Sequence, residues 1–120
     1  MPERNIFSFD RLYRRTKNGV GASGSVVRLK LRPVGANLLR VLTHVTVENQ
    51  TSAYTKCRLG ITSVGRDLFL DEMNTIAADE LAVSRSDTPL GEGDYFFADL
   101  TGTTTGDVLV MTCLGWDLKL

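Results

Sequence analysis

The sequence of 120 residues is poor in the residues that most enzymes and metal sites need. It has a single histidine, His44, and two cysteines, Cys57 and Cys113, which lie far apart in the chain. These three residues cannot supply the four ligands of a typical zinc site. The sequence also lacks a Gly-x-Ser-x-Gly turn and a phosphate loop ending in Gly-Lys-Ser or Gly-Lys-Thr. We therefore expect no enzymatic activity, no metal and no cofactor.

Long hydrophobic runs are also missing. No apolar run approaches the roughly 18 residues that a membrane-spanning helix needs, and residues 1–5 are not the apolar stretch of a secretory signal. We therefore expect no contact with membranes, and a location in the cytoplasm unless the protein leaves as part of a larger particle. Because cysteine packs as a small apolar residue, we expect Cys57 and Cys113 to be buried free thiols. A disulfide between facing strands is the alternative.

A glycine-rich segment, residues 19–24, reads GVGASG and has the spacing of the dinucleotide-binding fingerprint. That fingerprint needs a strand before it and a helix after it, so that the pyrophosphate lies at the helix N-terminus. Here a basic segment comes before the glycines and a strand pattern follows them. We interpret residues 19–24 as a flexible linker of small residues.

The net charge of zero hides a strong division along the chain. Residues 1–60 contain 11 Lys and Arg against 3 Asp and Glu, whereas residues 61–120 contain 3 against 11. One interpretation is self-neutralisation, in which strands from the two halves pair and place opposite charges side by side. The other is a bipolar surface that favours ordered contact between copies or with a charged partner. The two are compatible.

The first 25 residues combine aromatic and basic side chains. The spacing of Phe9, Leu12 and Tyr13 predicts one or two helical turns, which Ser8 would cap and residues 18–19 would end. So short a helix is marginal alone and needs a surface to lie against. We predict that residues 1–25 form an N-terminal arm and linker that binds a partner through Phe7, Phe9, Arg11, Leu12, Tyr13, Arg14 and Arg15. In the alternative, the arm folds back over an edge strand of its own domain.

Beyond residue 25, apolar and polar residues alternate with the period of two that is typical of strands. Residues 71–82 fit a helical turn as well as a strand, and residues 108–114 lack alternation, which predicts a strand buried on both faces. Turn residues separate about seven or eight short strands, without a long helix. We therefore predict an antiparallel β-sandwich or jelly roll over residues 26–120. The clearest strand would have one face made of Leu39, Val41, Thr43, Val45 and Val47.

Nucleic acid is the main competing partner. Together with the arm, four further basic residues would form a positive stripe of the kind that binds phosphate, as in an OB-like barrel; they are Arg28, Lys30, Arg32 and Arg40. Against this, the isoelectric point is near 6.6, and the acidic second half would repel phosphate over much of the surface. We therefore do not expect nucleic acid as the partner, and keep a nucleic-acid-binding β-barrel as an alternative.

Four segments from residue 38 onward combine strand patterns with turns rich in glycine, threonine and acidic residues. They are 43–49 (THVTVEN), 54–61 (YTKCRLGI), 89–94 (PLGEGD) and 101–109 (TGTTTGDVL). This arrangement resembles the small β-sandwich or jelly-roll accessory proteins of tailed-bacteriophage virions. The resemblance implies a non-enzymatic structural protein of the virion, assembled in the host cytoplasm. It further implies a head decoration or cement protein, a homotrimer seated on the major capsid protein or another virion protein. A tail or head-to-tail connector component is the alternative.

Overall fold

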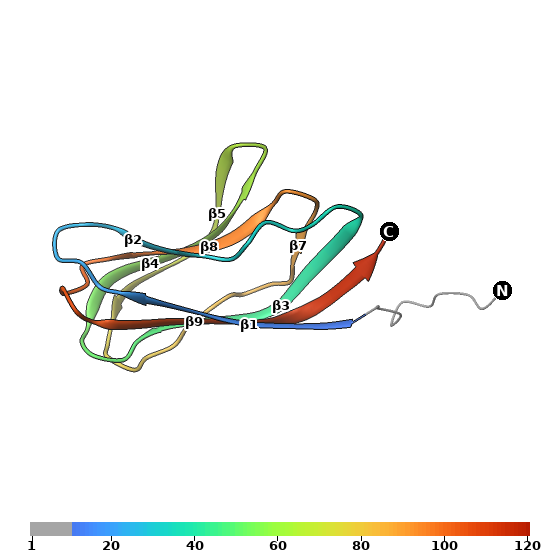
Figure 1. The fold of residues 1–120 in the computed structure, drawn as a ribbon. Coiled ribbons are helices and arrows are strands. Elements are labelled where there is room, and N and C mark those ends of the chain that lie inside the picture. The colour runs from blue at the N-terminus through green and yellow to red at the C-terminus, as the bar shows by residue number, and fades with distance from the viewer. Residues whose placement is uncertain (1–10) are drawn as a thin grey trace.

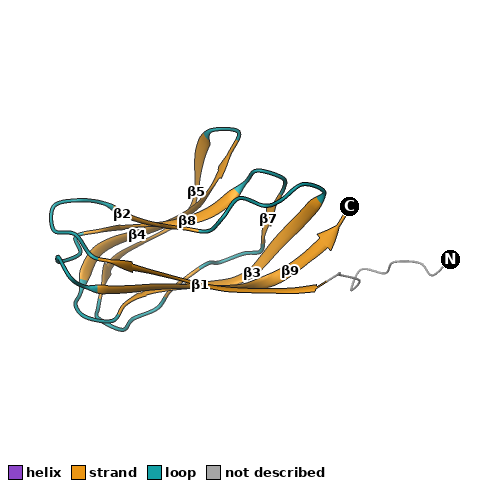
Figure 2. Ribbon diagram, in the orientation of Figure 1, coloured by secondary structure: helices purple, strands orange, loops and turns teal. Residues whose placement is uncertain are grey.

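The computed structural model describes residues 11–120, which form two antiparallel β-sheets packed face to face (Figure 1). Within this range every regular element is a strand (Figure 2). The first sheet consists of β1 (Arg11–Val20), β9 (Val108–Lys119) and β3 (Leu38–Asn49), with β6 (Ala82–Val83) and β7 (Thr88–Leu90) on the far edge of β3. The second sheet has the order β2 (Val27–Lys30), β8 (Tyr95–Thr101), β4 (Tyr54–Ser63) and β5 (Arg66–Ile76). The predicted all-β sandwich is confirmed.

The strands pair from the two ends of the described chain inward. β1 pairs with β9, β2 with β8, β3 with β6 and β7, and β4 with β5. Contacts of β3 with β9 and of β4 with β8 complete the two sheets. Such nested antiparallel pairing is the strand order of a jelly roll, in which β6 and β7 together act as one interrupted strand.

The structure contradicts the helix predicted near the N-terminus. Residues 11–20 form β1, which pairs with β9 from Arg11–Asp117 to Val20–Val108. This pairing satisfies the backbone along the whole strand and buries Tyr13, whereas one or two helical turns would be marginal. The basic segment from Arg11 to Val20 is therefore a strand of its own domain. This agrees with the alternative in which the arm folds back over an edge strand. Phe7 and Phe9 lie outside the described residues.

The segment predicted as a flexible linker is hydrogen-bonded to the rest of the sandwich. The Gly21 amide donates to the carbonyl oxygen of Asp107 at 2.8 Å, and the Gly106 amide donates to the carbonyl oxygen of Gly21 at 3.2 Å. The Ala22 amide donates to Oγ1 of Thr103 at 3.1 Å. The connection between β1 and β2 is therefore fixed against the connection between β8 and β9.

β3 contains a bulge that sequence alternation does not reveal. The register with β9 shifts between Leu42 and His44, so that the pairing skips Thr43. Opposite the bulge lies Gly115, where a Cβ would collide with the backbone of β3. The glycine therefore permits the close approach of the two strands.

The bulge changes which residues of β3 face the core. Arg40 and Leu42 are buried before it, and Val45 and Val47 are buried after it. One extra residue reverses the alternation, because side chains of a strand point to opposite faces in turn. The predicted continuous face is therefore wrong at its first three positions, which are Leu39, Val41 and Thr43.

The structure also settles the predictions for two strands, β5 and β9. Residues 66–76 form the edge strand β5, which decides the ambiguity between helix and strand over residues 71–76. β9 is not buried on both faces, because Val108 and Leu114 are exposed while Leu109 and Met111 are in the core. A strand made of consecutive apolar residues can thus have one face in the core and the other exposed to solvent.

The core between the sheets is apolar and includes both cysteines. Cys57 of β4 and Cys113 of β9 are buried free thiols, as predicted. Burial raises the pKa of each thiol to about 12. Because the thiolate is the reactive form, neither sulfur is a nucleophile at neutral pH in the folded protein.

Ion pairs join the basic first half of the chain to the acidic second half. On the second sheet, Nε of Arg28 lies 2.7 Å from Oδ1 of Asp99, and Nη2 of Arg28 lies 3.0 Å from Oδ2 of Asp67. The Arg28 guanidinium also covers the ring of Phe97 at 3.8 Å from its centroid. The predicted self-neutralisation between strands is therefore present.

In the first sheet, Asp117 of β9 lies between two arginines of neighbouring strands. The register places Arg40 of β3 and Arg11 of β1 directly opposite Asp117. Arg40 donates two hydrogen bonds to the carboxylate, at 2.8 and 3.2 Å, and Arg11 donates one at 3.4 Å. The side chain of Asp117 is 2% exposed and that of Arg40 is 11% exposed. Arg40 is thus a buried partner of Asp117, and the prediction that it is an exposed cation of a surface stripe is wrong.

A second buried carboxylate, that of Asp107, joins the loops at one end of the sandwich. Its Oδ2 accepts hydrogen bonds from Nδ2 of Asn49 at 2.8 Å, from Oγ of Ser52 at 2.7 Å and from the amide of Thr104 at 2.8 Å. These hydrogen bonds, that from Asn49 first, hold the pKa of Asp107 below its ordinary value of 3.8. The ionised form is therefore the one that the fold stabilises.

We expect Asp117→Ala to lower the free energy of unfolding by about 3–5 kcal/mol, because it leaves the buried Arg40 without its counter-charge. The matched control is Asp67→Ala, which removes a more exposed carboxylate from Arg28 and should lower the free energy of unfolding much less, because water screens an exposed ion pair. Urea denaturation followed by circular dichroism measures both. Equal losses in the two variants would contradict a special role for the buried pair.

We expect Asp107 to make the fold sensitive to acid. Since folding lowers its pKa, the ionised carboxylate stabilises the fold at pH values above the ordinary 3.8, and this contribution is lost as the pH falls through the lowered pKa. Asp107→Asn does not titrate, so its free energy of unfolding should fall less than that of the wild type between neutral and strongly acidic pH. Urea denaturation at both pH values tests this. The same fall in both proteins would refute it.

Candidate binding groove

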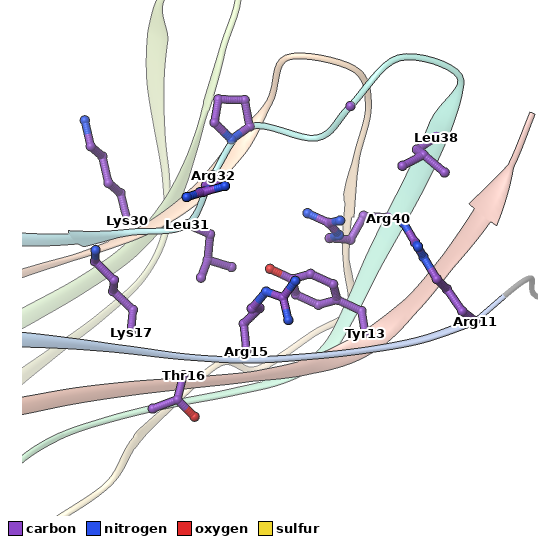
Figure 3. A pocket seen from close by; sticks show the side chains of 12 residues that line it. Arg11, Tyr13, Arg15, Thr16, Lys17, Lys30, Leu31, Arg32, Leu38 and Arg40 are labelled. Carbon is purple, nitrogen blue, oxygen red and sulfur yellow. The ribbon is translucent and has the colours of Figure 1, made fainter.

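A groove lies between β1 and β2, on the side of the sandwich where these strands are the edges of their sheets (Figure 3). Its volume is about 400 Å³. Every charged residue in its lining is basic, and we call it the basic groove. It is lined by Arg11, Tyr13, Arg15, Thr16, Lys17, Lys30, Leu31, Arg32, Pro33, Gly35, Leu38 and Arg40.

β1 contributes alternate residues to the basic groove. Arg11, Tyr13, Arg15 and Lys17 project from β1 toward the side of β2, as the period of a strand requires (Figure 3). Tyr13 reaches the core, whereas Arg15 and Lys17 remain exposed. Charged residues at such positions stay hydrated because β1 is an edge strand, and they also discourage the edge from pairing with other chains.

The floor of the basic groove is held in place by Tyr13 and Arg40. The Arg40 guanidinium lies 3.8 Å from the centroid of the Tyr13 ring, and that of Arg15 lies 5.7 Å from it. Asp117 fixes Arg40 in this position through two hydrogen bonds. Burial raises the pKa of Tyr13 above its ordinary 10.0, although Arg40 acts in the opposite direction. The tyrosine hydroxyl is therefore neutral at physiological pH.

Four cations of the basic groove have no ion-pair partner among residues 11–120: Arg15, Lys17, Lys30 and Arg32. The other two cations, Arg11 and Arg40, share the single carboxylate of Asp117. Six cations thus line a concave surface where Asp117 is the one carboxylate paired with any of them among residues 11–120. This excess of positive charge attracts anions by raising the local potential. Guanidinium groups add paired hydrogen-bond donors that match carboxylate and phosphate oxygens. The groove is suited to binding an anionic group.

The structure brings together part of the predicted binding set. Arg11, Tyr13 and Arg15 line the basic groove. Leu12 and Arg14 alternate with them and project from the other face of β1, where Leu12 is 61% exposed. The remaining predicted residues, Phe7 and Phe9, lie outside the described part of the chain.

The predicted positive stripe is divided by the fold. Lys30 and Arg32 line the basic groove as exposed residues, and Arg40 lines its floor as a buried partner of Asp117. Arg28 is not part of the groove lining and is paired with Asp99 and Asp67. The sequence does not show that Lys30 and Arg32 join the segment from Arg11 onward in one concave site. The sequence does indicate the contribution of β1 to the groove, because basic and aromatic residues recur at positions 11, 13, 15 and 17 with the period of a strand.

The residues considered for catalysis or metal binding lie apart from the groove. His44 is exposed on β3. Within residues 11–120, no group of three or more histidine, cysteine and acidic residues is placed to hold a metal ion. The same range contains no helix with the length and apolar character to cross a membrane.

Comparison with known proteins gives similarity in structure without similarity in sequence. No family model and no curated protein matches the sequence. A chain in the acidic stable capsid structure of Helicobacter pylori bacteriophage KHP30 is similar with a TM-score of 0.60 and 12% identity, over 94% of this chain and 97% of that chain.

A second similar structure comes from a different class of protein. It is a Bacteroides thetaiotaomicron protein assigned as an α-L-fucosidase, with a TM-score of 0.51 and 5% identity, over 82% of this chain but only 21% of that chain. A chain in the infectious bursal disease virus Gt strain structure has a lower TM-score of 0.42 and 10% identity, over 99% of this chain and 38% of that chain. At these identities the similarities show the fold alone, a β-sandwich that occurs as a chain of a phage capsid structure and as a part of a larger protein.

Proposed function

We propose that the protein is a non-enzymatic structural component of a viral particle, and specifically a capsid decoration or cement protein that binds the major capsid protein and its own copies. The observation that carries this proposal is the nearly complete match, in both directions, with one chain of a phage capsid structure. In the fucosidase comparison, by contrast, the matched part is about a fifth of the other chain. The jelly-roll strand order adds support, because this fold recurs in viral capsid proteins.

The basic groove supports a role in binding another macromolecule. An apolar and aromatic floor surrounded by cations offers both buried area and charge complementarity, which together give affinity and orientation. Within the proposed binding set, Arg11, Tyr13 and Arg15 act in the groove, while Leu12 and Arg14 act on the outer face of β1. Phe7 and Phe9 are proposed to extend the same contact.

Nucleic acid is the second candidate partner, and the cations of the basic groove favour it. Single-stranded nucleic acid is usually bound through aromatic rings on which bases stack. Tyr13 is the aromatic residue of the groove lining, and it is 7% exposed and lies against Arg40. Its ring is therefore poorly placed to stack with a base. Carboxylates of a protein partner fit the groove better than a nucleic-acid strand. A tail or connector component is the alternative within the virion.

Binding to viral heads tests this proposal. Heads produced from a viral genome that lacks this gene are mixed with the purified protein and sedimented. We expect saturable co-sedimentation and a higher temperature for DNA release, because a bound cement protein adds contacts that must break before the shell opens. Complete virions are the control, since their sites are already occupied and should take up no further protein.

Three results would overturn the assignment. Failure to bind the heads would reject the decoration role. Attachment only at the portal or tail, seen by electron microscopy, would favour the connector alternative. Retention on immobilised DNA that falls steeply with salt, without binding to heads, would indicate a nucleic-acid-binding protein.

A further inference from the structure

We propose that the basic groove of one copy binds the opposite, acidic side of a second copy, so that copies associate head to tail. This inference deepens the proposed function, since it names the surfaces that join copies of the chain. It rests on the strand order, the unpaired charges of the described residues and the grooves at the two sides of the sandwich.

The strand order places the two surfaces on opposite sides of the sandwich. β1 and β2 are the edges of the two sheets on one side, and the basic groove lies between them. On the other side the edges are β5 in the second sheet and β6 with β7 in the first sheet. A sandwich therefore presents one pair of edges to each neighbour when copies lie side by side.

The second side carries unpaired carboxylates. Asp79, Glu80 and Asp87 are exposed in the segments that connect β5, β6 and β7. None of the three forms an ion pair within residues 11–120. The two remaining carboxylates nearby are already neutralised, because Asp71 pairs with Arg85 and Glu72 pairs with Arg58. Unpaired negative charge on this side thus faces away from the unpaired positive charge of the basic groove.

A second groove, between β5 and the connection around β6, marks the acidic side. Its volume is about 420 Å³. The charged residues of its lining are Glu72, Glu80 and Arg85, of which Arg85 is paired with Asp71, and the lining also includes Met73 and Leu81. Leu81 is 51% exposed. On the basic side, Leu31, Pro33 and Leu38 are the apolar residues of the lining. Both sides thus combine apolar surface with charge of opposite sign, the composition expected of a contact with a polar rim.

Head-to-tail contact suits a chain of this charge. A heterologous contact uses two different surfaces of each copy, and it closes into a ring when the rotation between copies permits. Because the whole chain has a formal net charge of zero, a ring of such copies accumulates no net charge and no long-range repulsion. The contact should weaken with added salt, since exposed charges are screened.

Charge reversal tests the pairing of the two sides in the full-length protein. The groove variant is Lys17→Glu with Arg32→Glu, which changes two exposed cations that form no ion pair within residues 11–120. The acidic-side variant is Glu80→Lys with Asp87→Lys, and the combined variant carries all four changes. The matched control is Lys56→Glu, which lies on the outer face of the second sheet, because it alternates with the core residue Cys57.

Light scattering after size exclusion gives the solution mass over a range of concentrations and salt. We expect the wild type and Lys56→Glu to associate, each double variant to associate at least about tenfold more weakly because like charges then meet, and the combined variant to regain association. Circular dichroism and thermal melting confirm that all variants fold. A monomeric wild type, unchanged association in both double variants, or no recovery in the combined variant would each overturn the proposal.

Head binding separates this inference from the proposed function. A wild-type protein that stays monomeric in solution and nevertheless binds heads would reject the head-to-tail contact and leave the decoration role intact. A protein that associates through these two sides and does not bind heads would reject the decoration role and support the contact between copies.

Discussion

The buried carboxylate of Asp117, which contacts the buried Arg40 and the exposed Arg11, holds the first sheet together across three adjacent strands. Two charged groups are removed from water here, and their attraction offsets that cost only because the geometry is close and the hydrogen bonds are made. The same contact presses the Arg40 guanidinium against Tyr13 and so shapes the floor of the basic groove. Stability of the sheet and shape of the candidate site therefore depend on one carboxylate.

An edge strand with inward-pointing cations serves two requirements at once. A sandwich leaves open sides, and an exposed edge strand invites pairing with other chains. Arg15 and Lys17 make such pairing unfavourable for an apolar strand, yet they also make the open side attractive to an acidic surface. The cations of β1 thus disfavour pairing of this edge with strands of other chains, and they favour contact with an acidic surface.

The sequence is sufficient for the fold class because period-two alternation reports strands directly. It is insufficient for the direction of side chains in β3, since the bulge at Thr43 is matched by Gly115, more than seventy residues away in the chain. Alternation alone therefore places Arg40 on the surface. The helical spacing of Phe9, Leu12 and Tyr13 is equally misleading, because the pairing of β1 with β9 is a long-range contact that no local pattern encodes. The basic groove combines residues of β1 and β2. Because long-range contacts bring these strands together, the sequence predicts only part of the groove.

The nested pairing of strands has a consequence for how the chain reaches its native state. The first described strand, β1, pairs only with β9, and the paired residues range from Val20 with Val108 to Arg11 with Asp117, which are 88 to 106 positions apart. During synthesis the first sheet therefore lacks its middle strand until residues 108–119 have left the ribosome, and closure of a long loop must precede that pairing. Completion of the basic groove thus comes late in folding, so that only a molecule with β9 in place presents the surface through which it is proposed to associate.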